Sequence, residues 1–310
     1  MPEIDPALFA PSAIEPETVE FNRELERSLA ELPPTHLVPV EETRAARDAG
    51  RGIFPPGGPL EGSDWRALAG GRRVRLSPAD GAPRGIYLHI HGGGWSLGRP
   101  SHYDRHNQTI AAEAGATVVS AEYRLAPEHR WPAQIEDLRA AFDWVRAEYP
   151  GLPIVLGGES AGAHLAACLL IELRAHGRLD RIAGVCLNYG MYDLRMTASV
   201  ANWGPRQLIL STPTIAWFVA NLVPDAAGRA APAVSPLLAD LSGMPPALFQ
   251  IGTEDPLIDD SLMMAARWAG AGRQAELAIY PGGVHAFDNF DLAIAARFRA
   301  RQIEFIAGCL

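Results

Sequence analysis

The order of apolar and polar positions divides most of the chain into two alternating kinds of segment. Short, nearly continuous apolar runs are typical of strands buried on both faces, and they occur at residues 86–90, 117–122, 154–156, 185–188, 247–251 and 276–280. Longer stretches with helical spacing predict helices at residues 104–114, 132–148, 161–175, 259–271 and 290–306. This alternation predicts an α/β fold, a mostly parallel central sheet with helices on both faces, with residues 74–76 as an antiparallel edge strand.

Two regions stand apart from this alternation. Near the N-terminus, Pro16 begins a segment whose apolar residues lie mostly three or four positions apart, which predicts an amphipathic helix that needs an apolar partner. A loop rich in Gly and Pro follows at residues 47–60. Between Tyr189 and Pro246 lies an apolar, aromatic-rich helical insert, which is too long for a simple crossover. We interpret the two regions together as a small helical cap over the sheet.

The predicted organisation is a core that is interrupted once. Residues 1–60 form the N-terminal part of the cap, and residues 191–235 form its helical insert. Residues 61–190 and 236–310 form the core, which is large enough for one α/β domain. The apolar side chains of the insert would equally suit a dimer surface, so a homodimer remains an alternative use of this segment.

The composition excludes several classes of function. The chain of 310 residues has a formal net charge of −9, which disfavours nucleic acid as a partner. Its 27 Lys and Arg positions are all arginine, so Schiff-base chemistry is excluded. No apolar run is long enough to span a membrane, and the acidic, Pro-rich N-terminus lacks the pattern of a signal peptide. Three widely spaced cysteines without metal-ligand spacing predict free thiols in a cytoplasmic protein.

The candidate chemistry begins at Ser160, which lies between a predicted strand and a predicted helix. Gly158 and Gly162 flank it, each two residues away, which is the pattern of a nucleophile elbow. Such a turn is too tight for side chains at the flanking positions, and it lifts the serine Oγ out of the sheet. The helix that begins there points its N-terminal amides at any negative charge that forms nearby. The pattern therefore predicts Ser160 as a nucleophile.

A serine nucleophile needs a base, and the base needs a group that orients it. Asp255 and His285 each follow a strand-like run, so both are expected at the same edge of the sheet as Ser160. The order Ser, Asp, His along the chain is the order of α/β hydrolases. Asp255 also precedes a proline, which favours an extended residue on a turn. Its competitors as the orienting acid are Glu254, Asp259 and Asp260.

Three glycines follow the strand-like run at residues 86–90, directly after His91. Successive glycines let backbone N–H groups converge on one point, without side chains that would block a ligand. We predict that the amides of Gly92, Gly93 and Ala161 bind the oxygen of a tetrahedral intermediate. We expect His91 to brace this loop through hydrogen bonds.

These motifs resemble the hormone-sensitive-lipase-like family of esterases, also called bacterial class IV, within the α/β-hydrolase superfamily. The resemblance covers about residues 80–310, and its matching segments are residues 91–94, 123–128, 158–162, 255–257 with Asp259, and 285–287. The common elbow of that family has Asp where this chain has Glu159, which leaves the subfamily open but not the chemistry. We expect Glu159 to hold the elbow through backbone hydrogen bonds.

The resemblance implies a serine carboxylester hydrolase that uses no cofactor and no metal. Its partner would be a small-molecule ester with a short to medium acyl chain, because the cap closes the pocket. We expect the pocket to be lined by Trp95, Tyr189, Trp203, Leu210, Trp217 and Phe218. The resemblance places dimer contacts more often at the last strand and helix, which favours the insert as a cap.

Two other functions remain as alternatives at this point. The same triad would serve an amidase or a deacetylase of aryl amides. A non-catalytic small-molecule receptor on this fold is the second, and the intact motif around His285 argues against it.

Overall fold

The computed structural model describes residues 3–310 and contains one eight-stranded sheet. The strand order is β1-β2-β4-β3-β5-β6-β7-β8, and β2 is antiparallel to both β1 and β4. The other neighbouring pairs are parallel. The strands are β1 (Asp64–Ala67), β2 (Arg73–Ser77), β3 (Gly85–Ile90), β4 (Ala116–Ala121), β5 (Ile154–Glu159), β6 (Ile182–Asn188), β7 (Ala247–Glu254) and β8 (Ala275–Val284). The predicted, mostly parallel sheet is confirmed.

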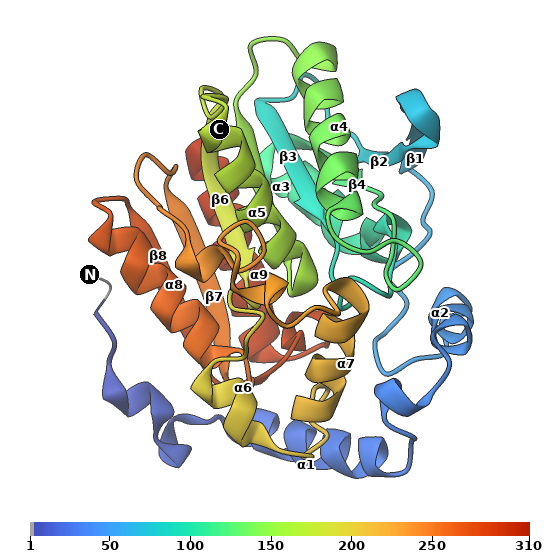
Figure 1. Cartoon of the computed structure of the whole chain (residues 1–310), viewed down its shortest axis with the longest axis vertical. Helices are drawn as coiled ribbons and strands as arrows, with labels where there is room; N and C mark the ends of the chain where they lie inside the picture. The colour runs from blue at the N-terminus through green and yellow to red at the C-terminus, as the bar shows by residue number, and fades with distance from the viewer. Residues whose placement is uncertain (1–2) are drawn as a thin grey trace.

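Helices cover both faces of this sheet. They are α1 (Pro16–Ala30), α2 (Val40–Asp48), α3 (Asp104–Ala114), α4 (Ala133–Glu148), α5 (Ala161–Ala175), α6 (Ala198–Trp203), α7 (Thr212–Leu222), α8 (Ile258–Gly270) and α9 (Ala293–Cys309). Figure 1 shows α4, α5 and α8 in front of the sheet and α3 and α9 behind it. The sheet between two helical layers confirms the predicted α/β architecture. Among residues 3–310, no helix combines the length and apolarity needed to cross a membrane.

The middle of the sheet explains why its strands could be read from the sequence. All six residues of β3, β4 and β5 are buried, so each strand is covered on both faces and must be apolar along its whole length. The helix ends follow local rules as well. For example, α3 ends at Gly115, whose φ of 66° is a left-handed conformation that costs glycine little.

The strand predicted at residues 74–76 is β2, and it is antiparallel as expected, but it is not the edge of the sheet. The outer strand is β1, in which Asp64 pairs with Leu76. β1 has the sequence Asp-Trp-Arg-Ala and its residues are mostly exposed, so it shows no apolar run that could reveal it. The last helix also begins later than predicted, at Ala293, because Phe290 and Leu292 are still extended after a 3₁₀ turn at Phe287–Asn289.

The N-terminal helix and the insert gather at one end of the molecule. Figure 1 shows α1, α6 and α7 together at the lower end of the view. α1 buries Leu25 and Leu29, and the ring of Phe21 packs against Phe290 at 4.8 Å between centroids. The apolar partner that the pattern of α1 requires is therefore the region around β8 and the start of α9.

Candidate active site

Ser160 occupies the turn between β5 and α5 with a φ of 56° and a ψ of −118°. A positive φ is strained for a serine, so the surrounding backbone must hold it. A Cβ atom at Gly158 or Gly162 would lie 2.1 or 1.9 Å from the carbonyl oxygen of Ile90. The turn therefore packs directly on β3, and this contact requires glycine at both flanking positions. The Ser160 amide donates to the carbonyl of Asn188 at 2.9 Å, which ties the turn to β6 as well.

Ser160, His285 and Asp255 form one hydrogen-bonded chain at the end of the sheet. The Ser160 hydroxyl donates to His285 Nε2 at 2.8 Å, and His285 Nδ1 donates to Asp255 Oδ2 at 2.8 Å. The other oxygen of Asp255 accepts the amide of Leu257 at 2.9 Å. The edge of the Tyr189 ring packs against the imidazole, with centroids 5.0 Å apart. The acid and the ring are thus both fixed, and Nε2 is left to accept the proton of the serine.

The other acidic side chains near Asp255 have different partners. Asp260 is buried and accepts the amides of Tyr192 and Asp193 and the hydroxyl of Thr197. Asp259 accepts the amide of Ser199 at 2.8 Å. Glu254 pairs with Arg206 at 2.8 Å. Asp259 and Asp260 therefore fasten the start of the insert to α8, and only Asp255 among these acids bonds to His285.

The three glycines after β3 do not play equal parts. The amide of Gly92 donates to the Tyr103 hydroxyl at 3.0 Å, so it is already engaged, and the role predicted for Gly92 in binding an oxyanion is wrong. The amides of Gly93, Gly94 and Ala161 make no hydrogen bond within residues 3–310. All three of these residues line the same cavity as Ser160. The free donors beside the nucleophile are therefore one residue further along the glycine run than predicted.

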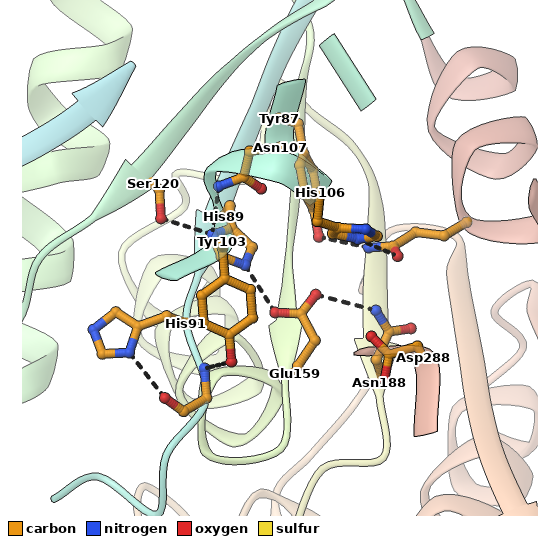
Figure 2. Close-up of polar contacts among 12 residues, drawn as sticks. Tyr87, His89, His91, Tyr103, His106, Asn107, Ser120, Glu159, Asn188 and Asp288 are labelled. Atoms are coloured by element: carbon orange, nitrogen blue, oxygen red, sulfur yellow. Dashed lines mark hydrogen bonds and ion pairs between the residues drawn. The ribbon is translucent and has the colours of Figure 1, made fainter. Parts of the chain in front are cut away.

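A buried polar cluster lies beneath the elbow and the glycine loop, and Figure 2 shows its members. Glu159 accepts a hydrogen bond from His89 Nε2 at 2.8 Å, and the Asn188 amide group lies 3.4 Å away. The Tyr103 ring, whose hydroxyl accepts the Gly92 amide, packs against His89 at 4.9 Å between centroids. The cluster thus connects the residue before the nucleophile to the loop that carries the free amides.

We expected the side chain of Glu159 to bond to the backbone, and this expectation is wrong. Its hydrogen-bond partners are the side chains of His89 and Asn188. Burial by itself raises the pKa of the Glu159 carboxyl, but His89, with smaller contributions from His106 and Asn188, brings the pKa below its ordinary value. Glu159 is therefore ionised, and its negative charge is held by His89 under the elbow.

Two more histidines hold the loop from its sides. His91 Nδ1 donates to the Gly92 carbonyl at 2.9 Å, and its ring stacks on Tyr123 at 4.2 Å. His164 Nε2 donates to a backbone carbonyl, which leaves Nδ1 to accept the indole N–H of Trp95 at 3.0 Å. Burial lowers the pKa of His91 well below its ordinary value and that of His164 to about 4, so both rings are neutral.

A cavity of about 460 Å³ opens at Ser160. Its catalytic side includes the glycine loop, Ser160 and His285, and its other walls come from residues 29–58 and 207–218, which we call the cavity roof. The two parts of the roof meet where His36 Nδ1 and the Thr214 hydroxyl lie 3.0 Å apart. A Cβ atom at Gly94 would lie 2.3 Å from the ring of Phe218, so α7 packs tightly over the glycine loop.

Four of the six predicted pocket residues line this cavity, namely Trp95, Tyr189, Leu210 and Phe218. Trp203 and Trp217 do not line it, and this part of the prediction is wrong. The indole of Trp203 instead donates to the Arg206 and Leu210 carbonyls at 3.0 and 3.2 Å. Consecutive residues on a helix point about 100° apart, so Phe218 faces the cavity while Trp217 does not.

The sequence matches a known family over the part of the chain that carries this site. Residues 87–289 match the family model described as alpha/beta hydrolase fold. The chain belongs to the α/β-hydrolase fold family. It is 36% identical over 226 residues to the carboxylesterase NlhH of Mycobacterium tuberculosis strain H37Rv, which covers 69% of this chain and 70% of that protein. It is 31% identical over 289 residues to an acetyl-hydrolase of Streptomyces hygroscopicus, with 90% and 93% covered.

Solved structures agree with this assignment to the α/β hydrolases. A hyperthermophilic esterase from the archaeon Pyrobaculum calidifontis is 30% identical, with a TM-score of 0.85 over 95% of this chain and 98% of that one. A hormone-sensitive lipase from a metagenome library is 28% identical, with a TM-score of 0.84 over 94% of this chain and 98% of that one. The resemblance to the hormone-sensitive-lipase-like esterases that the motifs indicated is confirmed.

Several residues of this hydrolase site had no signal in the sequence. Tyr103 reaches Gly92 from a 3₁₀ turn after the glycine loop, and nothing in its neighbours marks it as a hydrogen-bond acceptor for that loop. The pairing of His89 with Glu159 joins residues on two adjacent parallel strands. Once β3 and β5 are known to be neighbours, His89 and Glu159 are expected to pair, because buried charged groups need partners.

Proposed function

We propose that this α/β hydrolase is a serine carboxylesterase that hydrolyses esters of short to medium acyl chains through an acyl-enzyme. The observation that carries the proposal is the continuous chain from Asp255 through His285 to Ser160, which ends in a cavity. The names of its relatives support ester hydrolysis, since they include carboxylesterase, carboxylic ester hydrolase and ethyl acetate hydrolase.

The first half-reaction is acyl transfer to the enzyme. Ser160 Oγ attacks the ester carbonyl while His285 Nε2 takes its proton, and Asp255 stabilises the imidazolium that results. The carbonyl oxygen becomes negative and is bound by the free amides of Gly93, Gly94 and Ala161. Each such donor contributes about 3–4 kcal/mol of transition-state stabilisation, which is why an engaged amide at Gly92 cannot replace a free one.

The second half-reaction returns the enzyme to its starting state. It follows the collapse of the first tetrahedral intermediate, in which the bond from the acyl carbon to the alcohol oxygen breaks and protonated His285 gives its proton to that oxygen. A water molecule then takes the place of the alcohol. His285 removes a proton from that water, which attacks the acyl carbon, and Ser160 leaves with the proton restored. Every proton and charge in this sequence is handled by the triad and by backbone amides, so the mechanism needs no metal and no cofactor.

The cavity limits the length of the acyl chain. Its volume of about 460 Å³ is closed on the side of the glycine loop by Phe218. Each methylene that fits contributes about 0.8 kcal/mol of transition-state binding, and a chain longer than the cavity clashes with its roof. The specificity constant kcat/KM should therefore rise over the first acyl carbons and then fall for long chains.

A series of p-nitrophenyl esters with increasing acyl length tests the proposal, with the Ser160→Ala variant as the control. We expect the wild type to hydrolyse the short members and the variant to lose a factor of about 10⁴–10⁶ in kcat. Matched anilides belong in the same assay, because an amidase on the same triad would turn them over at rates comparable to the esters. A variant that retains a few per cent of the activity would contradict the role of Ser160.

The absence of disulfides among the three cysteines of the described residues supports a proposal for the cellular location. Cys168 and Cys186 are buried free thiols, and Cys309 is a partly buried one. Free thiols of this kind persist in the reducing cytoplasm, so we propose that the protein works there.

A further inference from the structure

Among residues 3–310, one arginine is both partly buried and without a hydrogen-bond or ion-pair partner. The side chains of Arg47, Arg51, Arg105 and Arg130 make no hydrogen bond and no ion pair within residues 3–310. The last three are exposed, where water can solvate a guanidinium. Arg47 is partly buried, and a charged group that has lost part of its water needs a partner.

Arg47 lies on the wall of the cavity that contains Ser160. It comes from the last turn of α2, and its guanidinium lies 5.7 Å from the centre of the Phe54 ring. A Cβ atom at Gly98 would lie 3.7 Å from its Nη1, which places the guanidinium close behind the glycine loop. The positive charge of Arg47 acts on the neighbouring His102. Burial, and after it this charge, lowers the pKa of His102 to about 4.

The carboxylates around the cavity do not neutralise this charge. Asp48, the next residue, is bound to Arg99 at 2.6 Å and to His102 at 3.0 Å. Glu159 also lines the cavity, but it is held by His89 at 2.8 Å. Glu42 is exposed and forms no ion pair with Arg47. Within residues 3–310, the cavity wall therefore carries two arginines without an ion pair, Arg47 and Arg51, and only Arg47 is partly buried.

We infer that Arg47 binds a carboxylate on the substrate, so that the preferred esters carry one negative charge on the acyl or the alcohol part. This inference rests on the proposed esterase activity and adds a substrate class to it. A single guanidinium matches the charge and the fork geometry of one carboxylate. Arg51 also lines the cavity, but its side chain is exposed to water, so only Arg47 offers a partly buried guanidinium there. The rest of the cavity is largely apolar and suits the hydrocarbon between the two ends.

The alternative is that Arg47 only packs on Phe54 and supports the glycine loop. The Arg47→Met variant separates the two, because it keeps an apolar side chain of similar reach beside the ring and removes the charge. Arg105→Met is the matched control, since Arg105 is also unpaired within the described residues but is exposed and outside the cavity.

The test compares esters of equal length with and without a carboxylate. One pair is the mono-p-nitrophenyl ester of glutaric acid and p-nitrophenyl valerate, which places the charge on the acyl part. The other is 3-acetoxybenzoate and its methyl ester, which places it on the alcohol part. The Ser160→Ala variant supplies the blank, because a carboxylate can promote hydrolysis of its own ester.

We expect Arg47→Met to lower the ratio of kcat/KM for the charged ester to that for the neutral ester about 10- to 100-fold in at least one pair. Arg105→Met should leave both ratios unchanged, and added salt should lower the ratio of the wild type. Unchanged ratios in both pairs, or an equal loss on both members of each pair, would overturn the inference. Hydrolysis of the neutral esters by the wild type would still support the esterase activity, so the two failures are distinguishable.

Discussion

The catalytic edge of the sheet and the cavity roof are built in different ways. At the edge, Ser160, Asp255 and His285 follow directly after strands of one parallel sheet, and the elbow is pressed against β3 so closely that only glycine fits beside it. In the roof, residues 29–58 meet residues 207–218 through a few side-chain contacts, such as His36 with Thr214. The edge is fixed by backbone geometry, and the roof is fixed by its side chains. Substitutions at the edge should therefore affect the chemistry, and those in the roof should affect the choice of substrate.

After the loss of Ser160 itself, the largest effect is expected from the acid at the catalytic edge. Asp255→Asn keeps the shape of the side chain but favours the wrong tautomer of His285, which should lower kcat by about 10⁴. Asp259→Asn is the control, because Asp259 bonds to Ser199 and not to the triad. The measurement is kcat for a short p-nitrophenyl ester. An inactive Asp259 variant beside a nearly normal Asp255 variant would show that the acid is wrongly assigned.

Asp260 fastens the start of the insert to α8, and its titration should be visible in the stability of the fold. Burial raises the pKa of its carboxyl from 3.8 to about 7, although hydrogen bonds from Thr197 and two amides lower it. The folded protein thus holds this proton more tightly than the unfolded chain does. The resulting stabilisation is fully present below about pH 4 and is lost as the pH rises towards about 7.

The free energy of unfolding of the wild type should accordingly fall over this pH window relative to Asp260→Asn, by up to about 4 kcal/mol at roughly 1.4 kcal/mol per pKa unit. Urea unfolding of both proteins across the window measures it. Parallel pH profiles for the two proteins would contradict the assignment.

The sequence predicted those parts of the site that depend on neighbouring residues. The elbow around Ser160 follows from glycines two positions away, and the buried strands follow from continuous apolar runs. Parts that depend on distant residues were missed. The amide of Gly92 donates to the hydroxyl of Tyr103, which lies eleven residues further along the chain, and no local sequence pattern predicts that contact. Trp217 and Phe218 are both aromatic residues of one apolar helix, and only the orientation of α7 decides which one faces the cavity.

A tenfold effect is expected at Tyr103, the side chain that accepts the amide of Gly92. Tyr103→Phe removes the acceptor of the buried Gly92 amide and leaves the ring against His89. Because an unsatisfied buried amide costs about 1–3 kcal/mol, the glycine loop should shift and kcat should fall about tenfold, with KM nearly unchanged. Tyr149→Phe is the control, since its hydroxyl forms no hydrogen bond within residues 3–310. A normal kcat for the Tyr103 variant would show that this contact does not position the loop.

The smallest effect should appear in the roof and should change specificity instead of rate. Phe218→Ala opens the cavity beside Gly94, so longer acyl chains should fit. At chain lengths for which kcat/KM of the wild type falls, kcat/KM of the variant should instead rise by about fourfold for each added methylene. Trp217→Ala removes a larger side chain that does not line the cavity, so its chain-length profile should match that of the wild type. If Trp217→Ala shifted the profile and Phe218→Ala did not, the orientation of α7 over the cavity would be wrong.

The central claim is that Ser160 is the one nucleophile activated by this constellation, and covalent labelling tests it most directly. A small serine-reactive phosphonate, incubated with the folded protein and followed by intact mass, should add once to the wild type. Peptide mapping should locate the adduct on Ser160, and neither Ser160→Ala nor His285→Ala should be labelled at a comparable rate. An adduct on another residue, or equal labelling of the Ser160→Ala variant, would contradict the account.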